Sequence, residues 1–223
     1  TNQSLNVVIK NGKLLGYNIH TIAGRGKDTL TYRHPVGSAI GISKKRKADV
    51  AWLATDSAWE YAYASQEPVG ALKDSSPVID SRKLRKDGNL MNVRRPGLSK
   101  WKMEAAVGGG PVLVQDGQIK ITNEEELKFY GKAINDKHPR TAMGYTNNGK
   151  LIILVVEGRH EKIAEGATLT QLAQIFKDIG CKEALNLDGG GSSCMLVNGK
   201  ETIRVSDAAG QRPVPAVFEI FYQ

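Results

Sequence analysis

The chain carries four two-residue turn signals, and each lies beside an apolar run. They are Asn11-Gly12, Asp116-Gly117, Asn148-Gly149 and Asn198-Gly199. Asn-Gly and Asp-Gly tolerate the positive φ angles of the tight turns that join neighbouring antiparallel strands. The first signal, between residues 6–9 and Leu14-Leu15, predicts a β-hairpin with a type I′ turn. Together the four signals predict a largely antiparallel sheet.

Two helices are predicted within this β pattern. Thr122-x-x-Glu125 has the spacing of a capping box and predicts a short helix over residues 123–131. Thr168-x-x-Gln171 repeats that spacing before a second helix, and Gly180 supplies the C′ residue that ends it. One face of the second helix is apolar, with Leu169, Leu172, Ala173, Phe176 and Ile179. We expect this face to lie on the sheet.

Apolar runs locate further strands. Residues 151–156 are continuously apolar, which predicts a central strand covered on both faces. Residues 50–54 predict another buried strand. Trp59, Tyr61 and Tyr63 alternate with smaller residues and predict the strand after it. Residues 65–100 lack periodicity and predict a long surface loop, which in a compact domain is often functional.

The segment Asn186-Leu-Asp-Gly-Gly-Gly-Ser-Ser193 follows an apolar run that predicts a short buried strand. Three consecutive glycines permit positive φ angles and close approach of other groups. Their bare N–H groups can face an anion, and Asp188 stands at the strand end beside them. The same pattern also fits a glycine-rich β-turn with a surface carboxylate. It is not a P-loop, because no Gly-Lys-Ser/Thr follows.

Composition limits the function classes. The 223 residues are 40% hydrophobic and 24% charged, as in folded soluble domains. No apolar run approaches the roughly 20 residues that span a bilayer, and no signal peptide is found. The formal net charge of +8, partly in the basic segment 82–102, favours anionic partners. Signatures of nucleic-acid-binding modules are missing. Cys181 and Cys194 are not expected to form a disulfide.

Carboxylates and arginines gather in or beside the predicted turns. The carboxylates are Asp188, Glu157 and Asp207, and the arginines are Arg140, Arg159 and Arg212. Paired carboxylates are the usual apparatus of glycoside hydrolysis, whereas arginines bind phosphate through a planar donor fork. The combination predicts a substrate that is both a sugar and a phosphate ester, if these segments converge in space.

The segment around Asp188 resembles the signature of the phosphodiester glycosidase family. Five other segments extend the resemblance in order, namely Arg140-Thr-Ala142, Glu157-Gly-Arg159, Gly166-x-Thr-Leu169, Ser206-Asp207 and Arg212-Pro213. It covers residues 105–223 well and the first hundred loosely. It implies one domain over residues 1–223, without the N-terminal strand region of relatives. The implied fold is α+β: a curved, mainly antiparallel β-sheet with a long helix packed on one face and peripheral short helices.

The resemblance implies a hydrolase that releases an N-acetylglucosamine-like sugar from a sugar-1-phosphodiester or phosphorylated glycan. Asp188 would be the leading catalytic carboxylate, with Glu157 and Asp207 competing for the second role. Substrate binding would fall to Arg140, Thr141, Arg159, Asn186, Gly189, Gly190, Gly191, Ser192 and Arg212. No metal site and no required cofactor are implied, although a divalent cation is left open. A secreted or periplasmic location is implied, with the signal peptide absent from this sequence.

Two other functions stay open. The same arginines and glycines would serve a non-catalytic binder of anionic cell-surface glycan. A nucleic-acid binder would use the basic segment 82–102 instead. Released sugar distinguishes the hydrolase from the first of these, and a steep loss of DNA affinity with salt marks the second.

Overall fold

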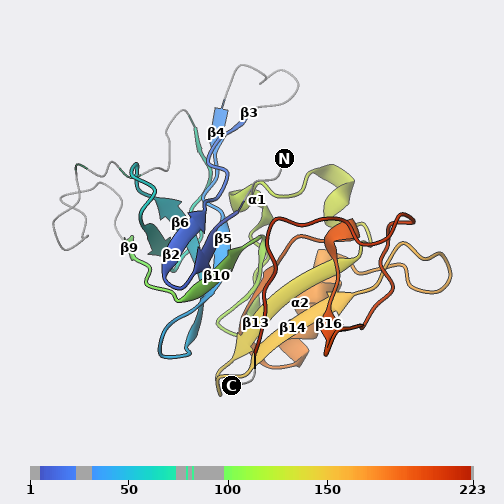
Figure 1. Cartoon of the computed structure of the whole chain (residues 1–223). Helices are drawn as coiled ribbons and strands as arrows, with labels where there is room; N and C mark the ends of the chain where they lie inside the picture. Colours follow the sequence, from blue (N-terminus) through green and yellow to red (C-terminus); the bar gives the residue numbers. More distant parts are fainter. Residues whose placement is uncertain (1–5, 24–31, 74–78, 80–81, 83–97, 222–223) are drawn as a thin grey trace. The chain divides into compact units, whose positions relative to one another are not determined.

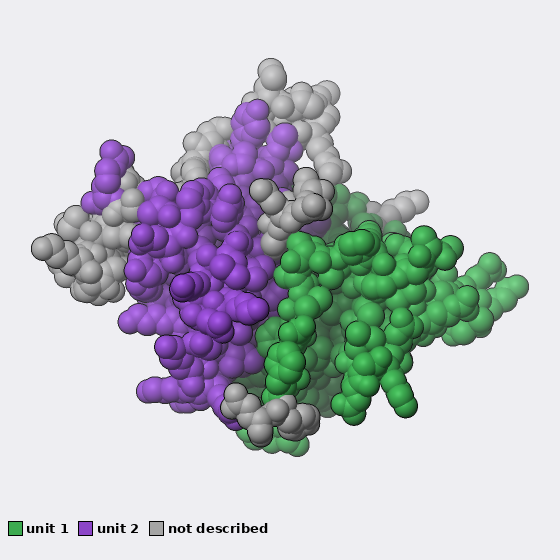
Figure 2. Space-filling view, in the orientation of Figure 1, with its two compact units in different colours: residues 1–4, 112–121, 129–223 green, residues 5–111, 122–128 purple. Residues whose placement is uncertain are grey.

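The computed structural model describes residues 6–23, 32–73, 79, 82 and 98–221. The chain divides into two compact units (Figure 2). Unit 1 comprises residues 1–4, 112–121 and 129–223, and unit 2 comprises residues 5–111 and 122–128. Every predicted site residue belongs to unit 1. The prediction of a single domain over residues 1–223 stays a prediction.

Unit 2 is built on a seven-stranded antiparallel sheet (Figure 1). The strand order is β2 (Lys13–Gly16), β1 (Val8–Lys10), β10 (Ala105–Gly108), β5 (Ser38–Ile42), β6 (Ala48–Thr55), β7 (Ala62–Ser65) and β9 (Ser99–Lys100). A second sheet has the order β3 (Ile22–Ala23), β4 (Tyr32–His34) and β8 (Leu72–Lys73). Asn11 and Gly12 have φ angles of 52° and 72°, so the predicted hairpin is confirmed.

The central strands of unit 2 are buried on both faces, since β5, β6 and β7 are buried at consecutive positions. Ile9, Ala51, Leu53, Trp101 and Ala106 belong to one core cluster. The buried strand predicted at 50–54 is confirmed within β6. The strand predicted from Trp59 is wrong at its start, because β7 begins only at Ala62. Trp59 has a φ of 58°, which is a turn conformation. Most of the predicted loop 65–100 lies outside the described residues.

The predicted helix over 123–131 is much shorter in the structure. Helix α1 spans only Asn123–Glu126, and Leu127 ends it with a φ of 53°. The Thr122 side chain makes no capping hydrogen bond and instead donates from Oγ1 to Oε1 of Glu126 at 2.6 Å. The expected capping box is therefore wrong, because the inward-turned Glu126 binds the Thr122 hydroxyl.

Unit 1 contains a five-stranded antiparallel sheet, a helix and a small hairpin (Figure 1). The sheet order is β12 (Gln118–Ile119), β11 (Val112–Gln115), β15 (Cys181–Asn186), β13 (Arg140–Thr146) and β14 (Leu151–Val156). The hairpin pairs β16 (Leu196–Val197) with β17 (Lys200–Glu201). Two 3₁₀ segments, η3 (Gly131–Ile134) and η4 (Gly190–Ser192), complete the unit.

The position of β14 contradicts the prediction of a central strand over residues 151–156. Residues 151–156 form a strand, but it is the edge strand of the sheet and is partly exposed along its whole length. The core-facing side chains Ile152, Leu154 and Val156 pack against the buried cluster of unit 1. The strand is therefore apolar without being central. Strand β15, just before Asp188, is the central one and is almost fully buried.

Helix α2 (Leu169–Asp178) confirms the second predicted capping box. Thr168 Oγ1 accepts from the Gln171 N–H at 3.1 Å, and Gln171 Oε1 accepts from the Thr168 N–H at 3.0 Å. Leu169, Leu172, Ala173 and Phe176 are buried together with Leu113, Ala142 and Ala184 of the sheet. Ile179 is 44% exposed and lies outside this face. Gly180, with a φ of 84°, ends the helix as predicted.

The prediction of a mainly antiparallel β fold is confirmed. A long helix packed on one face is not supported, because α1 and α2 of the described residues have only 4 and 10 residues. Neither is long and apolar enough to cross a membrane. Cys181 and Cys194 are both free thiols.

Candidate active site

Three glycines bring three chain segments against the backbone of residues 138–140. A Cβ at Gly158 would lie 2.7 Å from Pro139 N, and one at Gly166 would lie 2.4 Å from His138 O. A Cβ at Gly189 would lie 2.8 Å from Pro139 O. Such distances exclude a side chain, so these glycines permit direct backbone packing. The segments after β14, before α2 and after β15 therefore meet at the start of β13.

The Asp188 loop is held on this scaffold by backbone hydrogen bonds. Leu187 N donates to Thr141 O at 2.8 Å, and Gly190 N donates to Pro139 O at 2.9 Å. Asp188 itself is exposed, and its Oδ1 accepts from the Gly189 N–H at 2.9 Å. The loop is thus fixed at its base while the Asp188 carboxylate faces outward. The Gly189 N–H thus donates to the Asp188 carboxylate and the Gly190 N–H to the Pro139 carbonyl, so both N–H groups already have acceptors within the chain.

Gly190 and Gly191 abut one guanidinium and one carboxylate. A Cβ at Gly190 would lie 3.0 Å from Arg159 Nη2, and one at Gly191 would lie 2.0 Å from Asp207 Oδ2. Arg159 Nη1 and Asp207 Oδ1 are 3.5 Å apart, with the side chains 47% and 36% exposed. Ser206 Oγ also donates to Asp207 Oδ1 at 3.3 Å. The missing side chains of the two glycines therefore make room for this ion pair.

A second guanidinium reaches the same loop from the C-terminal segment. Arg212 is exposed, and its Nη2 donates to Ser192 Oγ at 2.7 Å. Residues 190–192 thus gather Arg159 from the segment after β14 and Asp207 and Arg212 from the C-terminal segment. These three residues therefore meet at the glycine loop, and a cavity that they share with the Asp188 carboxylate stays a prediction.

Arg140, Thr141 and Asn186 are placed differently. Arg140 is 3% exposed; its Nε donates to Ala167 O at 3.0 Å and its Nη2 to Asp136 O at 3.2 Å. Its burial lowers the pKa of its guanidinium. Thr141 Oγ1 donates to Ser193 Oγ at 3.2 Å, and Asn186 Nδ2 donates to Leu187 O at 2.9 Å. These hydrogen bonds of the three side chains hold together the segments that support the glycine loop.

Glu157 lies beside a histidine that sequence reasoning missed. Its Oε2 accepts from the Arg204 N–H at 2.9 Å, and its Oε1 lies 3.8 Å from Nε2 of His160. The interval of three residues between the two was a weak signal in the sequence. Glu157 therefore ties the end of β14 to the segment that leads to Asp207.

His138 was also missed, although it directly precedes Pro139. Desolvation by burial, followed by the positive charges of Arg140 and Arg159, lowers its pKa below the usual 6.5. Asp136 acts weakly in the opposite direction. The imidazole is therefore neutral at pH 7 and adds no positive charge beside the loop.

The chain is similar to a known protein family and to several known proteins. A model of the phosphodiester glycosidase family matches residues 1–221. N-acetylglucosamine-1-phosphodiester alpha-N-acetylglucosaminidase of Mus musculus is 30% identical over 94 residues, which cover 42% of this chain and 18% of that protein. The Homo sapiens enzyme of the same name is 29% identical over 147 residues, covering 55% of this chain and 28% of that protein.

A prophage-derived protein of Bacillus subtilis, YomE, is 39% identical over 89 residues, covering 40% of this chain and 14% of that protein. The chain thus spans less than a third of the length of each of these relatives.

Solved structures share the fold. A putative exported protein from Burkholderia pseudomallei superposes with a TM-score of 0.56 at 17% identity, covering 94% of this chain and 59% of that one. The zebrafish N-acetylglucosamine-1-phosphodiester alpha-N-acetylglucosaminidase catalytic domain, auto-inhibited by its pro-peptide, gives 0.53 at 22% identity, covering 95% and 55%. Both likenesses concern the fold alone.

Proposed function

Since the chain belongs to the phosphodiester glycosidase family, we propose that it hydrolyses the bond between the anomeric carbon of a sugar and a phosphodiester. Water supplies the oxygen that joins the anomeric carbon, and the phosphate leaves as a phosphomonoester of the aglycone. The names of the mammalian relatives support N-acetylglucosamine or a similar sugar as the released group. The proposal includes a secreted or periplasmic location, where phosphorylated glycans are exposed.

One observation carries the proposal: residues 190–192 gather an ion-paired carboxylate and two exposed guanidinium groups beside the exposed Asp188. Arg159 and Arg212 would bind the phosphate of the substrate. Neutralising its charge makes the phosphate a better leaving group, which lowers the need for a strong general acid. Asp188 would then act at the anomeric carbon, either as the nucleophile or as the base that activates water.

The contacts favour Asp207 over Glu157 as the second carboxylate. Asp207 lies against the glycine loop and is held by Arg159. Glu157 already accepts a hydrogen bond from the Arg204 N–H through Oε2, and its Oε1 lies near His160 Nε2. Arg140 takes a scaffold role in this proposal, because its guanidinium is buried and donates to two backbone carbonyls. Thr141, Asn186 and Gly189 position the loop, and Ser192 orients Arg212.

The proposal predicts which bond breaks. When the methyl diester of N-acetylglucosamine 1-phosphate is hydrolysed in ¹⁸O-water, the label should appear on the anomeric hydroxyl of the free sugar. Mass spectrometry of both products reads this directly. A methyl N-acetylglucosaminide without phosphate is the control substrate and should not react. Label found in the phosphate would identify a phosphodiesterase instead, and binding without release of sugar would identify a non-catalytic glycan binder.

A substitution in the glycine loop tests the role of Asp207. In Gly191→Ala the new Cβ would collide with the Asp207 carboxylate, which must swing away because it is the end of an exposed side chain. The free energy of unfolding should change by less than about 1 kcal/mol, since an exposed ion pair contributes little. The rate of sugar release should fall clearly.

The second arm of this test is a double-mutant cycle. In an Asp207→Ala background, Gly191→Ala should cause no further loss, because the two changes act on the same carboxylate. Additive losses in sugar release would show that Gly191 acts through something other than Asp207.

A further inference from the structure

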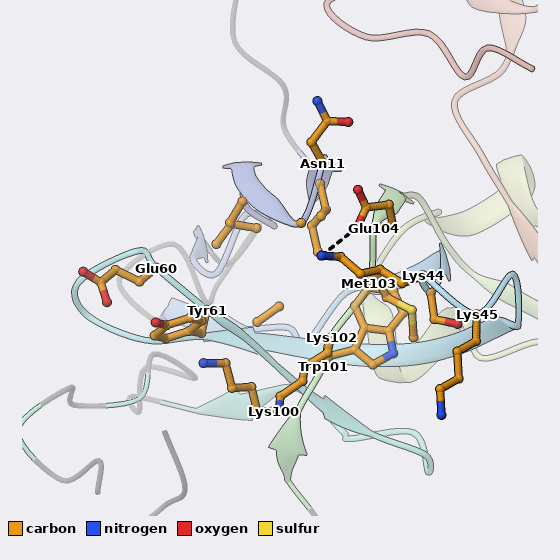
Figure 3. Close-up of a pocket in the computed structure, with 15 residues that line it drawn as sticks. Asn11, Lys44, Lys45, Glu60, Tyr61, Lys100, Trp101, Lys102, Met103 and Glu104 are labelled. Carbon is orange, nitrogen blue, oxygen red and sulfur yellow. Dashed lines mark ion pairs between the residues drawn. The ribbon is translucent and has the colours of Figure 1, made fainter. Parts of the chain in front are cut away.

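Unit 2 contains a cavity of about 550 Å³ that lies entirely within that unit (Figure 3). It is lined by the turn of the β1–β2 hairpin, by the segment after β5, by residues before β7 and by residues 100–104. None of these residues belongs to the glycine-loop site of unit 1. The volume is in the range of about 300–1,000 Å³ that is typical of sites for small ligands.

Positive charge dominates the lining. Four lysines, Lys44, Lys45, Lys100 and Lys102, line the cavity together with the two carboxylates of Glu60 and Glu104. Lys44 Nζ lies 3.9 Å from Glu104 Oε2, and the Lys44 side chain is 84% exposed. That contact is long and solvated, so Lys44 can turn to an incoming anion at little cost.

An aromatic ring forms one side of the cavity. Lys100 Nζ lies 3.0 Å from the centroid of the Tyr61 ring (Figure 3), and Tyr61 is 38% exposed. Such a cation–π contact positions the ammonium group without neutralising its charge. Lys100 therefore remains a donor to an anion that enters beside Tyr61.

The backbone of the cavity is held by hydrogen bonds before any ligand binds. Gly12 N donates to Glu104 O at 3.0 Å, Glu104 N to Ile42 O at 2.8 Å, and Trp101 N to Ala62 O at 2.9 Å. The Trp101 indole donates from Nε1 to Asp49 Oδ2 at 2.6 Å. Because these bonds join the lining segments to one another, a ligand need not order them on binding.

We propose that this cavity binds an acidic saccharide. The ammonium groups of Lys44 and Lys100 bind its carboxylate or phosphate groups, and the exposed Tyr61 edge contacts a sugar ring. A pocket of this size with two carboxylates in its lining suits a short saccharide better than a nucleic acid, whose continuous phosphates require an extended basic surface. This binding does not depend on the proposed hydrolysis.

Titration of the full chain with tetragalacturonate, followed by calorimetry, tests the proposal. Wild-type protein should bind it, and Lys44→Ala/Lys100→Ala should weaken binding by about tenfold or more, since hydrogen bonds to charged groups are lost. Lys150→Ala/Lys177→Ala removes the same charge from exposed positions of unit 1 and should bind like wild type. Asp188→Asn should also bind like wild type, which separates this site from the proposed active site.

Two further probes separate the alternatives. Maltotetraose, which is neutral, should bind at least about tenfold more weakly than tetragalacturonate because it lacks the charges that the lysines attract. Eight-residue oligothymidylate should also bind more weakly. Equal losses of tetragalacturonate affinity in both double-lysine variants would mean that binding depends on the net charge of the protein and not on this cavity. Tighter binding of the oligonucleotide than of tetragalacturonate would mean that the cavity binds nucleic acid. Either result, or no binding of tetragalacturonate, would overturn the proposal.

Discussion

Replacing Asp188 by asparagine is expected to lower the rate of sugar release by about 10²- to 10⁴-fold, the usual contribution of a catalytic acid or base. Asparagine has nearly the same size but no negative charge, so it can neither attack the anomeric carbon nor take a proton from water. The contact of Oδ1 with the Gly189 N–H is still available to an amide oxygen. The loop should therefore keep its conformation, and thermal unfolding should be unchanged.

Asp116→Asn is the matched control. Asp116 is also an exposed carboxylate of unit 1, and it lies in the tight turn between β11 and β12 with a φ of 49°, which asparagine accepts. This variant should release sugar at the wild-type rate. Hydrolysis of the methyl diester by Asp188→Asn at the wild-type rate would show that Asp188 has no catalytic role. The role of Asp207 would be unaffected by that result.

Glu126→Ala is expected to destabilise unit 2 by about 4 kcal/mol, because each buried donor left without its acceptor costs about 1–3 kcal/mol. Glu126 is 1% exposed. Its Oε2 accepts from Ser38 N and Oγ at 3.2 and 2.6 Å, and its Oε1 accepts from Trp52 Nε1 at 3.2 Å. Thr122 Oγ1 donates to the same Oε1. One carboxylate therefore satisfies polar groups of β5, β6 and the start of α1.

Urea unfolding followed by tryptophan fluorescence measures this change, since Trp52 is itself a donor to Glu126. Glu124→Ala, at an exposed position of the same helix, should stay within about 0.5 kcal/mol of wild type, as surface substitutions generally do. A loss of less than about 1 kcal/mol for Glu126→Ala would mean that water replaces the carboxylate, because a single net hydrogen bond is worth that much.

Several elements of the fold were predictable because short segments specify them. Asn11-Gly12 and Asp116-Gly117 have the positive φ angles of their predicted turns, and the Thr168 capping box forms in both directions. These features depend on atoms within about four residues of one another. The candidate site residues could be named from the sequence because the segment around Asp188 and five other segments together resemble one family.

Other elements depended on contacts between segments far apart in the sequence. The turn at Asn148-Gly149 has only Gly149 at positive φ, at 83°, and β14 became an edge strand although its sequence fits a central one. Arg140 and Arg159 are the same residue type near the ends of the paired strands β13 and β14, yet one is buried against carbonyls and the other is 47% exposed beside Asp207. Their sequence contexts do not distinguish them, because strand order and packing decide exposure.

The sequence by itself therefore determined the turns at Asn11-Gly12 and Asp116-Gly117, the cap of α2 and the residue types of the candidate site. Each of these follows from local backbone geometry or from the chemistry of single side chains. Only the tertiary structure decided which arginines meet the glycine loop, that Glu126 turns inward, and that four lysines surround a cavity in unit 2. These outcomes depend on which strands pair and on where three glycines let backbones touch, and no short segment encodes that pairing.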